Sequence, residues 1–342
     1  MILKIFLIHH RSPHHASNSG YGRLMDYIDA KVVYGKTKFP FRIAKFIAGF
    51  HSKTAGNYNV GSVLKAIELY HLLKKQNGQK NIVHFLNGER DIRHLGFFKR
   101  RFPNTKFCAT FHKPPEILRQ TISNSVALRK LDGAIAVGSN QVEFLKEWLG
   151  LEKIVYIPHG VDTEFFIPKP ILKEENTLLF VGQHLRDFDL FNATIFMLLT
   201  QVSHLKVEIV LHPAYVSKVI PHPQVHIHSK LTDGELLTLY QSATLLYLPL
   251  LNSTACNSIL EAMACGLTIV TSDVGGNSSY LKNTKSVLIN NRNVEAHFYE
   301  VVSMFNDKDG LNKAASLLRK KAEEIDWSKI SKKIILFYEN LY

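Results

Sequence analysis

The sequence has few cysteines and no long apolar run, and each shortage excludes a class of protein. Its three cysteines, Cys108, Cys256 and Cys265, are too few and too scattered for a disulfide framework or a four-cysteine zinc site. No apolar run approaches the roughly 20 residues that a membrane-spanning helix needs. The apolar run at 2–8 is followed by histidines and has no small-residue cleavage signal, so it predicts a buried strand rather than a secretion signal. Together these features predict a cytoplasmic protein in a reducing compartment.

Length and composition favour two folded domains. The chain has 342 residues, of which 46% are hydrophobic, 11% aromatic and 21% charged. That length suits two domains of roughly 150 to 180 residues, each with its own core. The apolar content excludes disordered, collagen-like and low-complexity proteins.

Acidic residues are scarce in the first half only. Residues 1–160 contain 25 lysines and arginines against 10 aspartates and glutamates, whereas residues 161–342 contain 17 against 19. Such an excess of positive charge favours an anionic partner: a phosphorylated substrate, an acidic membrane surface or a nucleic acid. A basic surface that serves only solubility is the alternative. Because the sequence contains no nucleic-acid recognition motif, we expect no nucleic-acid partner.

Short apolar segments alternate with longer helical patterns along the chain. The predicted strands are 3–8, 82–86, 106–111, 133–137, 154–157, 178–181, 206–211, 225–228, 244–248, 268–271 and 287–289. The predicted helices are 21–29, 60–75, 92–101, 140–149, 190–201, 233–241, 257–265, 294–305 and 311–323. This alternation is typical of β-α-β units, so we predict an α/β protein with two doubly wound, Rossmann-like domains of mostly parallel strands.

The stretch 157–170 marks the predicted domain boundary, because its three prolines interrupt any regular period. The predicted domains are therefore 1–160 and 161–325. Ligands of open α/β sheets bind outside the carboxyl ends of the strands. With two such sheets facing each other, we expect the site in the cleft between them.

The segment 248–276 carries the most chemical information. A predicted strand ends in a polar turn, and the helix 257–265 follows. Ser253, Thr254 and Asn257 can cap or flank the start of this helix, leaving backbone N–H groups that favour an anion such as a diphosphate. The sequence therefore predicts a phosphate site at this helix start.

Glu261 lies about one turn inside the same helix. A carboxylate at that depth can accept hydrogen bonds from two adjacent hydroxyls, as a ribose presents them. A solvated glutamate on the helix surface is the alternative, and the spacing alone does not decide between the two.

Several segments, taken together and in order, resemble the GT-B glycosyltransferases, in particular the large retaining family 4 (group 1). LEAMACG at 260–266, followed by a strand and SDVGG, resembles the nucleotide-sugar-binding core of that family. The other segments are DGAIAVGSNQVEFL at 132–145, YIPHGVDTEFF at 156–166, LFVG at 179–182 and the final helix at 327–342. The resemblance covers most of 80–342, whereas residues 1–80 match only in general pattern.

The resemblance implies a nucleotide-diphosphate sugar donor bound mainly by the second domain and an acceptor bound mainly by the first. It also implies transfer with retention at the anomeric carbon, no metal, no cofactor, and a C-terminal helix, 326–342, that packs back on the first domain. Glu261 matches the second glutamate of the family's E-x7-E pair, which is expected on the ribose hydroxyls. The candidate donor-binding residues are Gly182, Gln183, His184, Arg186, Ser253, Thr254, Ala255, Cys256, Asn257, Ser258 and Glu261.

The sequence departs from the family pattern at three positions. Ser253 stands where relatives have the first glutamate of the pair, and Gln183 and Phe188 stand where relatives have an arginine and a lysine for the diphosphate. Arg186 can supply a fork of donors to the same anion, with help from His184 if that ring is protonated. A surface pair of Arg186 with a neighbouring aspartate is the alternative. These departures also leave open a degenerate GT-B protein that binds nucleotide or glycan without catalysis.

The first domain offers further candidates at strand ends. His112 follows the predicted strand 106–111 and matches the family's histidine against the donor sugar, so we predict it as catalytic together with Glu261; Lys113 beside it is an extra cation. In the loop 9–22, Gly20 and Gly22 permit close approach to a phosphate, and Arg23 adds charge. The loop histidines have no carboxylate or cysteine companion with ligand spacing, so we expect no metal there; they are His9, His10, His14 and His15.

The stretch 36–53, KTKFPFRIAKFIAGFHSK, interleaves phenylalanine and isoleucine with lysine and arginine. Such a segment can lie in a membrane interface and attract anionic lipid, which would place the protein at the inner face of a membrane and favour a lipid-linked acceptor. An ordinary amphipathic helix that covers the sheet is the alternative.

Overall fold

The computed structural model describes residues 3–10, 18–51, 56–169 and 175–342. The chain forms two compact units. The first unit contains the described residues of 1–15 and 21–159 together with Ser328–Tyr342. The second contains those of 16–20 and 160–327. A short segment from the loop after the first strand therefore belongs to the second unit. The first domain predicted from the sequence contained all of residues 1–160.

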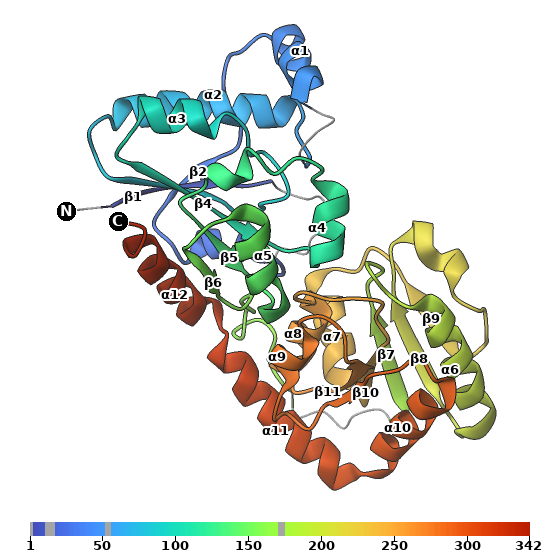
Figure 1. Ribbon diagram of the computed structural model, residues 1–342. Coiled ribbons are helices and arrows are strands. Elements are labelled where there is room, and N and C mark those ends of the chain that lie inside the picture. The colour runs from blue at the N-terminus through green and yellow to red at the C-terminus, as the bar shows by residue number, and fades with distance from the viewer. Residues whose placement is uncertain (1–2, 11–17, 52–55, 170–174) are drawn as a thin grey trace. The chain divides into compact units, whose positions relative to one another are not determined.

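The first unit is built on a six-stranded parallel sheet in the order β2-β1-β3-β4-β5-β6 (Figure 1). Its strands are β1 (Lys4–Ile8), β2 (Lys31–Val33), β3 (Asn81–Phe85), β4 (Thr105–Phe111), β5 (Gly133–Ala136) and β6 (Ile154–Tyr156). Its α-helices are α1 (Phe41–His51), α2 (Val60–Lys75), α3 (Leu95–Arg101), α4 (Pro115–Thr121), α5 (Val142–Leu149) and most of α12 (Trp327–Glu339). Short 3₁₀ helices span Tyr21–Asp26, Leu128–Lys130 and Ser139–Gln141.

The second unit has a six-stranded parallel sheet in the order β12-β11-β10-β7-β8-β9. Its strands are β7 (Thr177–Val181), β8 (Lys206–Val210), β9 (Val225–His228), β10 (Leu245–Leu248), β11 (Thr268–Ser272) and β12 (Val287–Ile289). Its helices are α6 (Phe188–Gln201), α7 (Asp233–Ser242), α8 (Asn257–Ala264), α9 (Asn277–Leu281), α10 (Val294–Asn306) and α11 (Lys308–Glu324), with a 3₁₀ helix at Pro213–Lys218. Helix α6 packs with α10, and α8 packs with α11.

The central strands are buried and mostly apolar because the sheets are covered on both faces. Every residue of β3, β5, β7, β10 and β11 is buried. A strand buried on both faces does not alternate apolar with polar residues, so it is recognised in the sequence as a short continuous apolar run. The strands predicted from such runs are the ones that the structure contains.

The strand order reverses at one place in each sheet. In the second unit β7 lies between β10 and β8, and in the first unit β1 lies between β3 and β2. The loops that leave adjacent strands at such a point run to opposite sides and open a crevice for ligands. In the second unit these are the loops after β7 and β10, which contain the candidate donor-binding residues.

The C-terminal helix α12 is tied to the first sheet through a buried histidine. His84 of β3 places Nδ1 2.6 Å from the hydroxyl of Tyr338 and Nε2 2.8 Å from the hydroxyl of Thr110. Burial, and to a smaller extent the neighbouring His112, lower the pKa of His84 to about 3, so the ring is neutral. The end of the chain therefore completes the core of the first unit.

The predicted α/β fold class with two doubly wound parallel sheets is confirmed. The prediction missed the three-residue edge strand β2 and the short helices α4 and α9, and the predicted helix 21–29 is a 3₁₀ helix at Tyr21–Asp26; a helix in the stretch 36–53, where α1 lies, was only an alternative. Short edge elements have too few residues for a clear period, which explains these errors. Within the described part of the chain, no helix combines the length and the apolar character needed to cross a bilayer.

Candidate active site

Three loops are bonded to one another at the carboxyl edge of the second sheet. The N–H of Leu251, after β10, donates to the carbonyl of Leu185, after β7, over 2.9 Å. The N–H of Gly276, after β11, donates to the carbonyl of Ser253 over 3.1 Å. Gly275 has a φ of +55°, and a Cβ there would overlap the Ser253 carbonyl oxygen, so only glycine fits this approach. These bonds hold the loops after β7, β10 and β11 together, and the loop after β10 leads into the start of α8.

Helix α8 begins at Asn257 without a side-chain cap. Its N-cap residue is Cys256, which makes no capping hydrogen bond. Ser253 and Thr254 are buried, and neither hydroxyl has a hydrogen-bond partner among the described residues. Of the two predicted alternatives, capping or flanking, these side chains do not cap the helix, because they precede the N-cap position. They flank the helix start as unused polar groups, and buried groups of this kind are costly unless a ligand satisfies them.

Glu261 is buried rather than on the surface of α8, with an exposed fraction of only 4%. Its carboxylate accepts hydrogen bonds from the hydroxyl of Ser19 over 2.5 Å and from the hydroxyl of Tyr240 in α7 over 2.8 Å. Burial raises the pKa of Glu261 to about 7, while the bonds from Ser19 and Tyr240 act in the opposite direction. The alternative of a solvated surface glutamate is therefore wrong.

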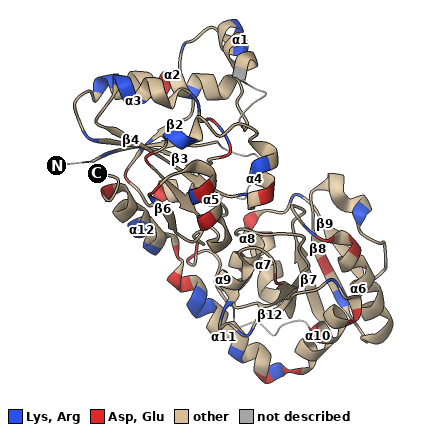
Figure 2. Ribbon diagram, viewed as in Figure 1, with Lys and Arg blue, Asp and Glu red and all other residues tan. Residues whose placement is uncertain are grey.

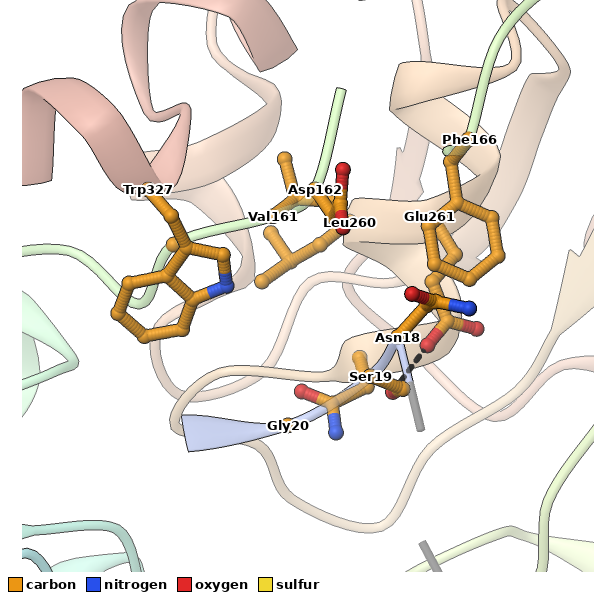
Figure 3. A pocket seen from close by; sticks show the side chains of 11 residues that line it. Asn18, Ser19, Gly20, Val161, Asp162, Phe166, Leu260, Glu261 and Trp327 are labelled. Atoms are coloured by element: carbon orange, nitrogen blue, oxygen red, sulfur yellow. Dashed lines mark hydrogen bonds between the residues drawn. The ribbon is translucent and has the colours of Figure 1, made fainter. Parts of the chain in front are cut away.

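The segment at 18–20 lies against α7 and α8 within the second unit. The backbone N–H and the side-chain amide of Asn18 both donate to the Asp233 carboxylate, over 2.9 and 3.0 Å. Figure 3 shows Ser19 pointing at Glu261 in a small pocket that Phe166 and Trp327 also line. Ser19 thus bonds the carboxylate that the family resemblance assigns to the ribose. Sequence reasoning missed Ser19 and Tyr240, because only the folded chain brings them to Glu261.

Arg186 is buried and fastens the loop after β7. Its guanidinium donates to the carbonyl of Val181 over 2.7 Å, to the carbonyl of His184 over 2.9 Å and to the hydroxyl of Ser258 in α8 over 3.2 Å. Asp187 is paired with Arg292 instead. The alternative of a surface pair between Arg186 and Asp187 is therefore wrong, and the charge of Arg186 lies beside the first turn of α8.

The remaining candidates of the second unit lie around these groups. Gly182 has a φ of +87°, which allows the chain to turn sharply as it leaves β7. The side chain of Gln183 is half-buried and accepts a long hydrogen bond of 3.5 Å from the N–H of His212. The side chain of His184 is exposed, whereas Ala255 is half-buried before α8.

In the first unit, a buried carboxylate positions His112. One oxygen of Glu89 accepts the backbone N–H groups of His112 and Lys113 over 2.7 and 2.8 Å. The His112 Nε2 atom lies 2.7 Å from the carbonyl of Leu86, so this nitrogen carries the proton and Nδ1 is left as an acceptor. The second oxygen of Glu89 is buried without a hydrogen-bond partner among the described residues. Glu89 was not predicted, since a single glutamate after a strand gives no pattern.

The residues predicted for a phosphate loop are divided between the two units, and their role stays a prediction. Gly20 belongs to the second unit and Gly22 to the first. Arg23 is paired with Asp26 over 2.7 Å, and the Lys113 ammonium donates to the hydroxyl of Thr121 over 3.2 Å. Both cations that were predicted for this side thus have partners within the first unit.

Of the loop histidines, His14 and His15 lie outside the described residues. Within the ranges that the structure describes, no group of three or more histidine, cysteine, aspartate and glutamate side chains is arranged to hold a metal ion.

Stability should depend on pH through Glu261. Because its pKa is higher in the folded protein than in the unfolded chain, the contribution of Glu261 to stability is fully present below a pH of about 4.5 and is lost as the pH rises through 7. The full loss is about 3 kcal/mol relative to Glu261→Gln, which does not titrate. Urea unfolding can be followed by the fluorescence of Trp327, in the second unit, in a Trp148→Phe background that removes the other tryptophan. Parallel pH profiles of the two proteins would contradict this prediction, and Glu295→Gln on exposed α10 is the matched control.

Comparison with known proteins agrees with this geometry. Residues 175–307 match the family model described as "Glycosyl transferases group 1", and the match includes the loops after β7, β10 and β11. None of the curated proteins matches the sequence.

Similar solved structures share the fold at low sequence identity. Sucrose-phosphate synthase from Thermosynechococcus elongatus is 15% identical, with 99% of each chain covered and a TM-score of 0.69. A glycosyltransferase from Rickettsia africae ESF-5 is 15% identical, with 99% of this chain and 98% of that chain covered and a TM-score of 0.66. An S. aureus TarM mutant in complex with fondaparinux, α-GlcNAc-glycerol and UDP is 16% identical, with 82% of this chain and 59% of that chain covered and a TM-score of 0.64. This chain therefore has the GT-B fold, carries the group 1 domain at 175–307, and is a glycosyltransferase.

Proposed function

We propose that the protein transfers a sugar from a nucleotide-diphosphate donor to an acceptor hydroxyl, with retention of the anomeric configuration and without a metal. The observation that carries the proposal is the combination of buried Glu261, an uncapped α8 and two unsatisfied hydroxyls at the reversal point of the second sheet. The TarM structure contains UDP, which supports a nucleotide donor by analogy.

The diphosphate would bind at the start of α8. The helix N-terminus presents N–H dipoles to an anion, and the hydroxyls of Ser253 and Thr254 can donate to phosphate or sugar oxygens. Arg186 adds a buried positive charge that carbonyl and hydroxyl oxygens hold but do not neutralise. A leaving diphosphate gains most from such fixed donors in a site that excludes water.

The ribose would bind Glu261. Its hydroxyls are donors of the same kind as the Ser19 hydroxyl, so they can replace that bond to one carboxylate oxygen while Tyr240 keeps the other. Two ribose hydroxyls favour the ionised carboxylate and lower its pKa from about 7. Donor binding and release of Ser19 are therefore coupled.

The first unit would bind the acceptor, and its excess of positive charge favours an anionic one such as a phosphorylated glycan or a lipid-linked sugar. In front-face transfer the bond from the anomeric carbon to the phosphate oxygen breaks, and a bond to the acceptor oxygen forms on the same face. The acceptor proton passes to the leaving phosphate, so no nucleophilic carboxylate is required. His112, held by Glu89 and Leu86, would lie against the donor sugar.

A comparison of ribonucleotides with 2′-deoxyribonucleotides tests the role of Glu261. Wild-type protein should bind UDP or GDP at least about tenfold more tightly than the 2′-deoxy form, because one hydrogen bond to a charged group is lost. Glu261→Gln should lose most of this preference, and Glu295→Gln should keep it. Titration calorimetry measures the affinities of all three proteins for both forms, and an unchanged preference in Glu261→Gln would remove the ribose assignment.

Arg186→Lys tests the anion site, because lysine keeps the positive charge but loses the planar set of N–H donors of the guanidinium. If Arg186 acts on the diphosphate, affinity for the nucleoside diphosphate should fall about tenfold while affinity for the nucleoside stays the same. If the residue only fastens the loop after β7, both affinities should fall together, and that result would contradict the proposed role.

Turnover separates the enzyme from a degenerate binding protein, the alternative that Ser253, Gln183 and Phe188 motivate. We expect slow release of nucleoside diphosphate from one member of a panel of nucleotide sugars. His112→Ala should reduce that rate about 10² to 10³-fold with donor affinity nearly unchanged, and exposed His71→Ala should not reduce it. Donor binding with no release from any sugar conjugate would favour the binding protein.

A further inference from the structure

Helix α1 of the first unit has its small residues inside and its large apolar residues outside. Ala44 and Ala48 are buried, with exposed fractions of 0% and 6%, and Ile47 lies beside them. Phe46 and Phe50 are exposed by 68% and 72%, the two highest values among the large apolar side chains of the described residues. A helix that only covered a core would place these residues the other way round.

The exposed apolar residues form one stripe along α1. Ile43, Phe46 and Phe50 follow the spacing i, i+3, i+7, which puts them on one side of a helix. The rings of Phe46 and Phe50 contact each other with centroids 5.0 Å apart. The stripe is therefore continuous over about two turns and has no cover within the described first unit.

The inner face of α1 packs on α2 and not on the sheet. Ala44 and Ala48 share a small cluster with Tyr58 and with Val63 of α2, separate from the main core of the unit. Figure 1 shows α1 beyond α2 as seen from the sheet. The alternative that α1 is an ordinary helix covering the sheet is therefore wrong.

Positive charge surrounds the stripe. Exposed Arg42 and Lys45 lie on the adjoining side of α1, and exposed Lys36 and Lys38 precede the helix. No aspartate or glutamate occurs between Asp29 and Glu68 in the sequence. Figure 2 shows blue but no red on α1. A partner that covers this surface must therefore have both an apolar region that buries the rings and negative charge that pairs with the cations.

We propose that the stripe of Ile43, Phe46 and Phe50, with its flanking cations, docks on an anionic lipid bilayer. A bilayer interface accepts aromatic rings at the level of the headgroups, while lysine and arginine remain with the lipid phosphates. A second copy of this chain fits less well, because a two-fold contact through this surface would bring its cations together. The proposal does not depend on sugar transfer, so the two can fail separately.

Vesicle sedimentation tests the charges. Wild-type protein should bind phosphatidylglycerol-containing vesicles in preference to pure phosphatidylcholine vesicles, and added salt should weaken the binding. Replacing Lys38, Arg42 and Lys45 by glutamine should reduce partitioning about a hundredfold. The matched control replaces Lys329, Lys332 and Lys333, three exposed lysines of α12 in the same unit. An equal loss in the control, or equal binding to both kinds of vesicle, would overturn the proposal.

A second pair of variants tests the apolar stripe. Phe46→Ser with Phe50→Ser should reduce partitioning about tenfold or more, whereas Phe196→Ser, which removes a ring 64% exposed on α6, should not. Circular dichroism should show unchanged melting, since the replaced rings are exposed. If the wild type dimerises in sedimentation analysis and the double variant is monomeric, the stripe belongs to a second copy and the membrane proposal is wrong.

Discussion

The buried carboxylate of Glu261 is the group around which the second unit is organised. It lies about one turn inside α8, away from water, and two hydroxyls from distant parts of the sequence bond its two oxygens. A buried carboxylate without such donors would cost several kcal/mol. The segment at 18–20, the start of α7 and the loops after β7, β10 and β11 all lie within reach of α8, and their mutual bonds hold this carboxylate and the helix start in one place.

The two units differ in their charge and in the polar groups that they carry. The second unit carries buried, directed groups: a carboxylate, two hydroxyls and one fastened guanidinium. The first carries a large excess of positive charge, and at its strand ends hydrogen bonds hold the buried Glu89 and the half-buried His112. A nucleotide needs precise partners, whereas an anionic acceptor or a lipid surface responds to summed charge. The difference between the halves is therefore consistent with the proposed division between donor and acceptor.

Ser19 introduces a coupling that the family resemblance alone does not suggest. Its hydroxyl occupies the position on Glu261 that the proposal gives to a ribose, while Asn18 binds Asp233 of α7. The chain enters the first unit immediately after Gly20. Under the proposed function, competition for one carboxylate would link the state of this segment to donor binding, because one hydroxyl would replace another.

By itself, the sequence determined the architecture and the segment of the chain in which the candidate site lies. Runs rich in apolar residues such as 178–181 and 244–248 predict strands because a strand buried on both faces is mostly apolar, and the LEAMACG segment predicts α8 with Glu261 inside it. Only the tertiary structure decided what each polar group touches. Arg186 contacts carbonyls rather than Asp187, Ser19 meets Glu261 across more than two hundred residues, and the phenylalanines of α1 face outward. These contacts depend on loop geometry and on packing between distant elements, and neither leaves a period or a motif in the chain.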